Sequence, residues 1–196
     1  MRFRQTWTAL SALVIFTLVL GVGYPLVVTA IGQLALNPQA NGSLVRVEGA
    51  IVGSALIGQT FTDKDGNALP EWFQSRPSAA GAGYDGGASS GSNFGPENPT
   101  FVTAIGERQA AIAKDDNVAI GQIPADAVTA SASGLDPHIS PAYARLQVAR
   151  VASARGIPKQ NVSALVESLI LQRDLGYLGE PTVNVLQLNI ALAKLG

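Results

Sequence analysis

The most prominent hydrophobic pattern lies at the start of the chain. Residues 7–31 form a nearly continuous apolar run, and no charged residue occurs between Gln5 and Val45. A run of this length crosses a hydrocarbon core of about 30 Å as one helix. From about Asn37 onward, apolar, charged and turn-forming residues alternate. The pattern predicts a membrane anchor over residues 1–36, with its span at about 7–31, and one soluble domain over residues 37–196.

The charges that flank the run predict its orientation. Arg2 and Arg4 precede it, whereas the next basic residue on the other side is Arg46. The positive-inside rule therefore places the N-terminus in the cytoplasm and the domain outside. A cleaved secretory signal ending near residues 28–30 is the alternative, but the run is about twice as long as an ordinary signal h-region.

Glycine and proline interrupt the apolar run at Gly21, Gly23, Tyr24 and Pro25. A neighbouring helix can satisfy the carbonyls that proline frees, and small residues permit close helix packing. This segment predicts a kink that contacts a partner subunit or membrane lipid. The alternative is a tyrosine at the membrane interface beside a fraying helix end.

The soluble domain shows an α+β pattern, with strands early and helices late. Residues 45–61 are predicted to be extended, and residues 62–67 to form a turn around Asp65-Gly66. Apolar residues at helical spacing predict helices in the second half of the chain. One of them, at residues 140–154, also has a serine cap, a first-turn proline and a glycine after its end. The predicted helical segments are 100–114, 140–154, 162–170 and 185–195.

A loop rich in glycine, serine and asparagine covers residues 80–99. A loop of this length in a compact domain is usually functional or disordered. Tyr84, Asn93 and Phe94 favour an ordered loop that is pressed on a surface.

Composition excludes several functions. The formal net charge of −1 provides no electrostatic basis for binding nucleic acid. With no cysteine and one histidine, the chain has no ligand set for structural zinc, and we expect no metal site.

Two short motifs suggest chemistry but have simpler interpretations. Residues 63–66 (Asp-Lys-Asp-Gly) differ by one residue from a P-type ATPase phosphorylation signature, and the segment fails as a calcium loop because position twelve is Gln74. Ser131, Ser133 and His138 share one stretch, but no nucleophile-elbow motif surrounds them. We interpret both segments as turns and expect no catalytic residue, with a membrane-anchored hydrolase as the lesser alternative.

Several strings together resemble the C subunit of the Kdp-type potassium-transporting P-type ATPase, the KdpC family. They occur in order along nearly the whole chain: Gly23–Leu26, Asn41–Leu44, Gly53–Gln59 with Phe61, Phe73, Arg76–Ala79, Ser90–Asn93, Asn98–Pro99, Val128–Asp136, Gln147, Arg150–Ala152, Gly179–Asn184 and Leu188–Asn189. The loop segment 80–87 departs from the family by its richness in glycine.

The resemblance implies a single-pass subunit of the bacterial cytoplasmic (inner) membrane with an extracytoplasmic domain. Its partners would be a channel-like potassium-translocating subunit, a P-type ATPase subunit and a small single-span subunit. The complex would use ATP, with magnesium, to import potassium, while this subunit has no cofactor of its own. The family-motif residues, without an assigned role, are Gly53, Ser54, Gly58, Gln59, Arg76, Pro77, Ser78, Ser92, Asn93, Ser131, Ser133, Gly134, Asp136, Gln147 and Asn184.

The resemblance implies two roles for such a subunit. One is a catalytic chaperone that raises the ATP affinity of the ATPase subunit, with the glutamine matching Gln147 involved. The other is assembly of the complex and shaping of its outer potassium entrance. The predicted topology favours the second, because it places the domain across the membrane from cytosolic ATP. A membrane-tethered, exported solute-binding domain is the alternative from another class.

Overall fold

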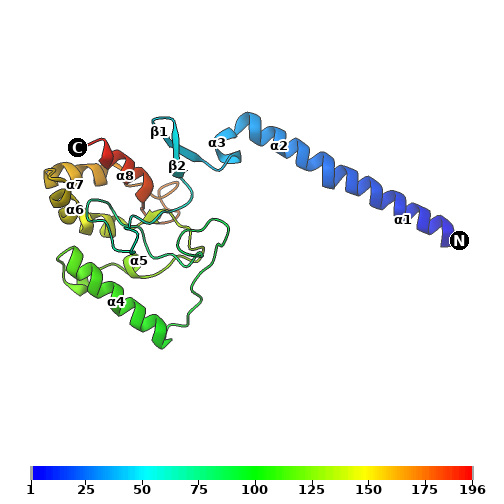
Figure 1. Ribbon diagram of the computed structural model, residues 1–196. Helices are drawn as coiled ribbons and strands as arrows, with labels where there is room; N and C mark the ends of the chain where they lie inside the picture. The colour runs from blue at the N-terminus through cyan, green and yellow to red at the C-terminus, as the bar shows by residue number, and fades with distance from the viewer. Residues whose placement is uncertain (1, 196) are drawn as a thin grey trace. The chain divides into compact units, whose positions relative to one another are not determined.

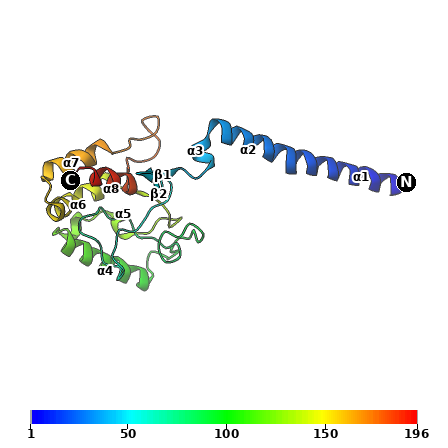
Figure 2. The same ribbon diagram turned by 45° about the horizontal axis from the view of Figure 1, so that its top comes forward.

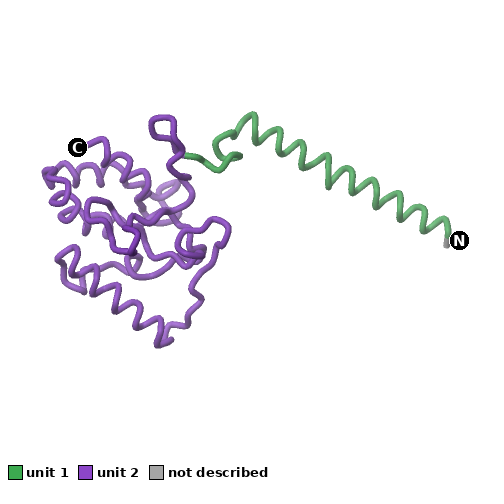
Figure 3. Tube along the Cα trace, viewed as in Figure 1, with its two compact units in different colours: residues 1–44 green, residues 45–196 purple. Residues whose placement is uncertain are grey.

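The structure, a computed structural model, describes residues 2–195. The chain divides into two compact units, residues 1–44 and residues 45–196 (Figure 3). The first unit consists of one long helix and a short one, and the second contains further helices, short strands and loops (Figure 1). The expected mixture of helix and strand after one N-terminal apolar helix is confirmed.

The apolar run forms an uninterrupted helical rod. It comprises α1 (Arg2–Phe16), the π-helix η1 (Thr17–Gly23) and α2 (Tyr24–Ala35), and the short α3 (Asn37–Ala40) follows. Residues Phe3–Ala35 have a mean hydropathy of 2.3, which makes them a candidate membrane span by length and composition. At 1.5 Å per residue this helix is about 50 Å long, more than the bilayer core requires.

The predicted interruption is a π-helical segment rather than a helix end. Pro25 has no N–H, and its ring displaces the carbonyl four residues earlier. The neighbouring Tyr24 N–H donates to the carbonyl of Val19, five residues back, which is the π pattern. The helix continues to Ala35, so the interpretation of Tyr24 as part of a fraying end is wrong.

The second part of the chain starts with a β-hairpin. Strands β1 (Leu44–Val47) and β2 (Ala50–Ser54) pair in a two-stranded sheet. Glu48 and Gly49 between them have φ of 50° and 84°, as a type I′ turn requires. The prediction of an extended segment was correct to Ser54, whereas residues 55–61 form a turn and irregular chain.

After β2, the described chain contains six helices and two short strands, joined by loops. They are α4 (Pro99–Asp115), the 3-10 helix η2 (Ile120–Gln122), α5 (Ala125–Val128), β3 (His138–Ile139), α6 (Pro141–Arg155), α7 (Lys159–Ser168), β4 (Val183–Asn184) and α8 (Val185–Ala193). The start of α6 matches its sequence signals, since the Ser140 hydroxyl accepts from Tyr143 N–H. Gly156 ends it with φ 66°.

The strand pair β3–β4 was not predicted. His138 lies opposite Asn184, and Ile139 opposite Val183. Each strand has only two residues, so neither shows the alternation by which a strand is recognised. The domain therefore does not place all its strands early.

The core lies where α6, α7 and α8 meet. Its fully buried apolar side chains include Phe73, Ile139, Val151, Val162, Val166, Val183, Val185, Leu188 and Leu192. Those on α7 and α8 recur at helical spacing, as the sequence indicated: Val162 and Val166 on α7, and Val185, Leu188 and Leu192 on α8. Helix α4 is more peripheral, and it has no fully buried residue.

Candidate functional site

An extended segment through the domain interior is held by side-chain amides. Asn189 Oδ1 accepts from Phe73 N–H at 3.0 Å, and Asn189 Nδ2 donates to Phe73 C=O at 2.9 Å. One residue later, Gln147 Oε1 accepts from Gln74 N–H at 2.6 Å and Nε2 donates to Gln74 C=O at 3.2 Å. Asn189 and Gln147 are 2% and 0% exposed. The segment is thus joined to α8 and α6.

Arg150 extends this network to other parts of the chain. Its Nε donates to Asp116 at 2.8 Å and its Nη2 to Gln147 Oε1 at 2.7 Å. Nη1 donates to the carbonyls of Pro70 and Trp72 at 2.8 and 3.0 Å. Burial raises the pKa of Asp116, although the charge of Arg150 acts to lower it. The guanidinium therefore joins α6 to two other segments, at Asp116 and at Pro70–Trp72.

A second polar cluster surrounds Asp136. Arg76 Nη1 donates to Asp136 Oδ2 at 3.0 Å, and the same guanidinium reaches the carbonyl of Thr129 at 3.3 Å. His138 donates its backbone N–H to Asp136 Oδ1 at 3.0 Å, with its Nδ1 at 3.3 Å. Burial acts to raise the pKa of Asp136, but the His138 hydrogen bonds and the Arg76 charge together hold it below its usual value.

Ser78 connects this cluster to the glycine-rich loop. Its hydroxyl donates to Gly134 C=O at 2.6 Å and accepts from Tyr84 N–H at 2.8 Å. The Tyr84 hydroxyl donates to the carbonyl of Arg76 at 2.7 Å, and burial raises the pKa of Tyr84 to about 12. Ser90 N–H donates to Ser133 C=O at 3.0 Å. The first part of the loop is ordered against residues 133–136, as Tyr84 indicated.

Two glycines allow these segments to approach closely. A Cβ at Gly134 would lie 2.5 Å from Ser90 O and 2.7 Å from Ala80 N. A Cβ at Gly58 would lie 2.2 Å from the Tyr84 ring and 2.9 Å from Asp136 O. Backbone contacts of this kind leave no space for a side chain.

The predicted residues Gly53, Ser54, Gln59 and Asn184 lie in a neighbouring group. Gln59 Nε2 donates to Val52 C=O at 2.7 Å, at a position that a Cβ on Gly53 would obstruct. Ser54 accepts the N–H of residue 56, and Asn184 caps α8 while donating to the carbonyl of residue 55 at 2.9 Å. This group fastens the β1–β2 hairpin to the start of α8.

The side chains of the other predicted residues stay outside these clusters. Ser92 and Asn93 are exposed, and Pro77 is half-buried between Arg76 and Ser78. Ser131 and Ser133 have their hydroxyls 3.4 Å apart, and Ser133 accepts from the N–H of Leu135. In the part of the chain that the structure describes, no hydrogen bond joins either serine to His138, so the hydrolase alternative gains no support.

Two clefts of the second unit are lined by both apolar and charged side chains. One, of about 580 Å³, has apolar walls from Phe61, Trp72, Leu186 and Ile190, and its lining also includes Arg46 and Lys194. The other, of about 400 Å³, lies between α4 and α6, and Arg108 and Tyr143 contribute to its lining. Within residues 2–195 there is no group of three acidic or histidine side chains that could hold a metal ion.

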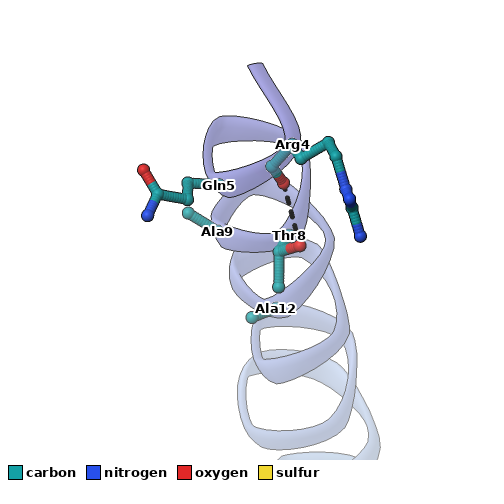
Figure 4. A pocket seen from close by; sticks show the side chains of 5 residues that line it. All are labelled: Arg4, Gln5, Thr8, Ala9 and Ala12. Carbon is teal, nitrogen blue, oxygen red and sulfur yellow. Dashed lines mark hydrogen bonds between the residues drawn. The ribbon is translucent and has the colours of Figure 1, made fainter. Parts of the chain in front are cut away.

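The anchor residues form no enclosed site. Gly21, Gly23, Tyr24 and Pro25 are all exposed along the helix. A shallow strip near the helix start is lined by Arg4, Gln5, Thr8, Ala9 and Ala12 (Figure 4). Thr8 donates its hydroxyl to the carbonyl of Arg4, while the small side chains of Ala9 and Ala12 leave the strip shallow.

Three important side chains were not predicted as site residues: Asn189 and Arg150, which occur in the family-motif strings, and Asp116, which does not. Asn189 did carry a signal, because it is the only amide on the core-facing positions of an otherwise apolar final helix. A lone polar residue at such a position indicates a buried hydrogen-bond partner. Arg150 and Asp116 gave no such signal, because their pairing joins residues 34 positions apart.

The fold and these clusters define a class: a protein with one apolar N-terminal helix and a small mixed domain whose polar side chains bind its own loops together. The chain belongs to the KdpC family, since the family model described as "K+-transporting ATPase, c chain" matches residues 6–194. The resemblance found in the sequence motifs is thereby confirmed.

Curated relatives agree with the family match. A protein of Caulobacter vibrioides is 55% identical over 185 residues, covering 94% of this chain and 90% of its own. One of Kineococcus radiotolerans is 53% identical over 189 residues, with 96% and 93% covered. One of Mycobacterium tuberculosis is 49% identical over 193 residues, with 98% and 99% covered. Each is named a potassium-transporting ATPase KdpC subunit.

Proposed function

We propose that this chain is a non-catalytic accessory subunit of an ATP-driven potassium import complex. In this proposal one helix anchors it in the bacterial cytoplasmic membrane, and its domain lies on the outer side. There it stabilises the assembly and shapes the outer potassium entrance. Its partners are a channel-like translocating subunit, a P-type ATPase subunit and a small single-span subunit, and the complex consumes ATP with magnesium.

The observation that carries the proposal is that the family-motif residues hydrogen-bond within their own domain. Arg76, Ser78, Gly134 and Asp136 hydrogen-bond to one another or to backbone of the same domain. A constellation for catalysis would instead aim a nucleophile and a base at a shared point in a pocket. Polar side chains that bind loops together favour a domain whose task is to present a defined surface.

The geometry of Gln147 bears on the ATP-affinity role. Its side chain is fully buried, and both ends of its amide are bonded to Gln74 backbone. Contact between this amide and a nucleotide would require those bonds to break. An effect of Gln147 on ATP affinity would therefore act through the domain's stability, as a coupling between distant sites.

Labelling of single cysteines tests the topology on which the proposal depends. The chain has no cysteine, so each introduced thiol is unique. Ser90→Cys and Gln160→Cys place thiols on exposed positions of the domain, and Phe3→Cys places one at the N-terminal end of the apolar helix. In intact cells, an impermeant thiol reagent is expected to label positions 90 and 160, and position 3 only after lysis. The opposite pattern overturns the proposed topology; labelling in denaturant controls for burial in the complex.

A further inference from the structure

Exposed apolar side chains of the second unit concentrate in two segments. One is residues 51–56, which comprises most of β2 and the start of the turn after it, and the other is residues 171–178, which lies between α7 and β4. Their exposed apolar residues, which we call the two-loop patch, are Ile51, Val52, Leu56, Leu171, Leu175, Tyr177 and Leu178. Leu175 is 81% exposed and Tyr177 69%. Large contiguous apolar surfaces on a soluble domain usually mark interaction sites.

The two segments are neighbours in space. Leu171 pairs with Thr182 through hydrogen bonds of 2.8 and 3.0 Å, which closes a hairpin over residues 171–182. Asn184, directly after this hairpin, donates to the carbonyl of Ala55 at 2.9 Å. Figure 2 shows the hairpin, the unlabelled loop between α7 and α8, projecting near β2 and away from the helices. The apolar side chains of both segments can therefore contribute to one surface.

One residue at the tip of this hairpin has a strained backbone conformation. Leu175 has φ 52°, a region that leucine rarely adopts because its Cβ is crowded there. Asp174 and Leu178 close the tip with two hydrogen bonds of 2.9 Å. Glycine or asparagine would fit this position with less strain. A strained leucine that also remains in water adds nothing to the core, which points to a contact outside the domain.

The charges around the patch indicate what covers it. Arg173 and Glu180 form an ion pair across the hairpin, and Asp174 flanks the tip. Insertion of these carboxylates into hydrocarbon would be costly. An apolar centre with a polar rim of both signs is instead the anatomy of a protein–protein interface. The rigid, hydrogen-bonded tip also suits a shaped protein pocket better than fluid lipid.

We propose that the two-loop patch docks this domain into an apolar pocket on the water-exposed part of a membrane-embedded partner subunit. Leu175 and Tyr177 are the central contacts, and Arg173, Asp174 and Glu180 form the rim. This inference rests on the proposed function, and it deepens that function by assigning the surface through which the domain supports assembly.

Photo-crosslinking in the intact complex tests the contact directly. Benzoylphenylalanine replaces Leu175 or Tyr177 in the full-length chain, expressed with its partner subunits. The control carries it at Val102 on α4, which is also more than half exposed (55%) but lies outside the patch. We expect a crosslink to a partner subunit from positions 175 and 177 and none from 102. Adducts to lipid alone, or protein crosslinks only from 102, would overturn the proposal.

A matched pair of substitutions separates docking from folding. Leu175→Asn removes the apolar contact but tolerates the positive φ, so the melting temperature of the full-length chain in detergent should hold or rise. Co-purification of partner subunits should fall about tenfold, as for a central interface residue. Val102→Asn is the control and should leave recovery unchanged.

Deletion of the whole chain distinguishes failure of the docking surface from failure of the assembly role. If deletion destroys the complex while Leu175→Asn leaves co-purification intact, the docking surface is wrong and the assembly role stands. If deletion also leaves a stable complex, the assembly role itself fails.

Discussion

Gln147 and Asn189 perform a task that a neighbouring strand normally performs. The backbone of residues 73 and 74 is enclosed by helices, and buried N–H and C=O groups require partners. A side-chain amide carries an acceptor oxygen and donor N–H groups at the spacing of a peptide group, so it can pair with a backbone residue as a strand would. Arg150 then fixes the Gln147 amide by donating to its oxygen.

Replacement of Gln147 by alanine should therefore destabilise the domain strongly. The change leaves the N–H and C=O of Gln74 without partners and removes one bond from Arg150. We expect a loss of about 2–4 kcal/mol in the free energy of unfolding, measured by denaturant titration. Gln160→Ala, on the exposed face of α7, is the control and should change it by less than about 0.5 kcal/mol. Equal effects of the two substitutions would contradict the role assigned to the amide.

Asp136 predicts a particular dependence of stability on pH. Its pKa is lower in the folded domain than in the unfolded chain, where it is about 3.9. The contribution of Asp136 to the free energy of unfolding is therefore complete above the unfolded pKa, and it is lost as the pH falls through the folded pKa. Asp136→Asn should lower stability at pH 7 and make the loss between about pH 5 and pH 2 shallower. Chemical unfolding at a series of pH values measures both effects, with the exposed Asp65→Asn as control. An unchanged acid slope in Asp136→Asn would refute the argument.

At the level of residues, sequence signals succeeded where the cause was local. The cap at Ser140 and the left-handed glycine at 156 depend on neighbours within a few positions. The pairs Arg76–Asp136 and Gln147–Gln74 join residues 60 and 73 positions apart. Periodicity does not encode such pairs. The family motifs therefore identified Arg76, Asp136 and Gln147, but only the fold shows with which residue each one pairs.

Among the elements, the glycine-rich loop depends most on long-range packing. Its composition allowed either order or disorder, because glycine and serine supply few apolar contacts. In the structure Ser78 and Tyr84 hold its first part, and its backbone crosses residues 133–134 closely enough to require a glycine there. The order of the loop thus depends on its packing against residues 133–134.

A pair of glycine substitutions tests this close crossing. Gly134 and Gly156 have nearly equal φ, 68° and 66°, but a Cβ at 134 meets backbone at 2.5 Å whereas none lies within 4 Å at 156. Both alanine variants pay about 1–2 kcal/mol for the left-handed conformation. Gly134→Ala should cost a further 1–3 kcal/mol, roughly, for overpacking. Thermal unfolding of both variants gives the difference, and a difference near zero would mean that the loop does not press on residue 134.

The whole molecule combines an apolar helix with a domain of low charge, and only the helix was evident from hydropathy alone. The Gly21–Pro25 segment was predicted to interrupt the helix, and it contains the junction between the π-helix η1 and the α-helix α2. Lipid tails are as apolar as the helix, so burial of apolar surface does not select its neighbours. Selection between membrane helices depends on shape, and a π segment with small residues provides a distinctive one.

Exchange of the anchor tests whether this shape matters to the complex. A foreign single-span helix of equal length replaces residues 5–36, while Arg2, Arg4 and the domain are kept. We expect the chain to remain in the membrane but recovery of partner subunits to fall by about tenfold, because specific packing of membrane helices contributes about 1–2 kcal/mol. A second foreign helix with Gly21, Gly23, Tyr24 and Pro25 restored should recover part of the loss. Full recovery with the unmodified foreign helix would show that the anchor is only a tether and that assembly depends on the domain alone.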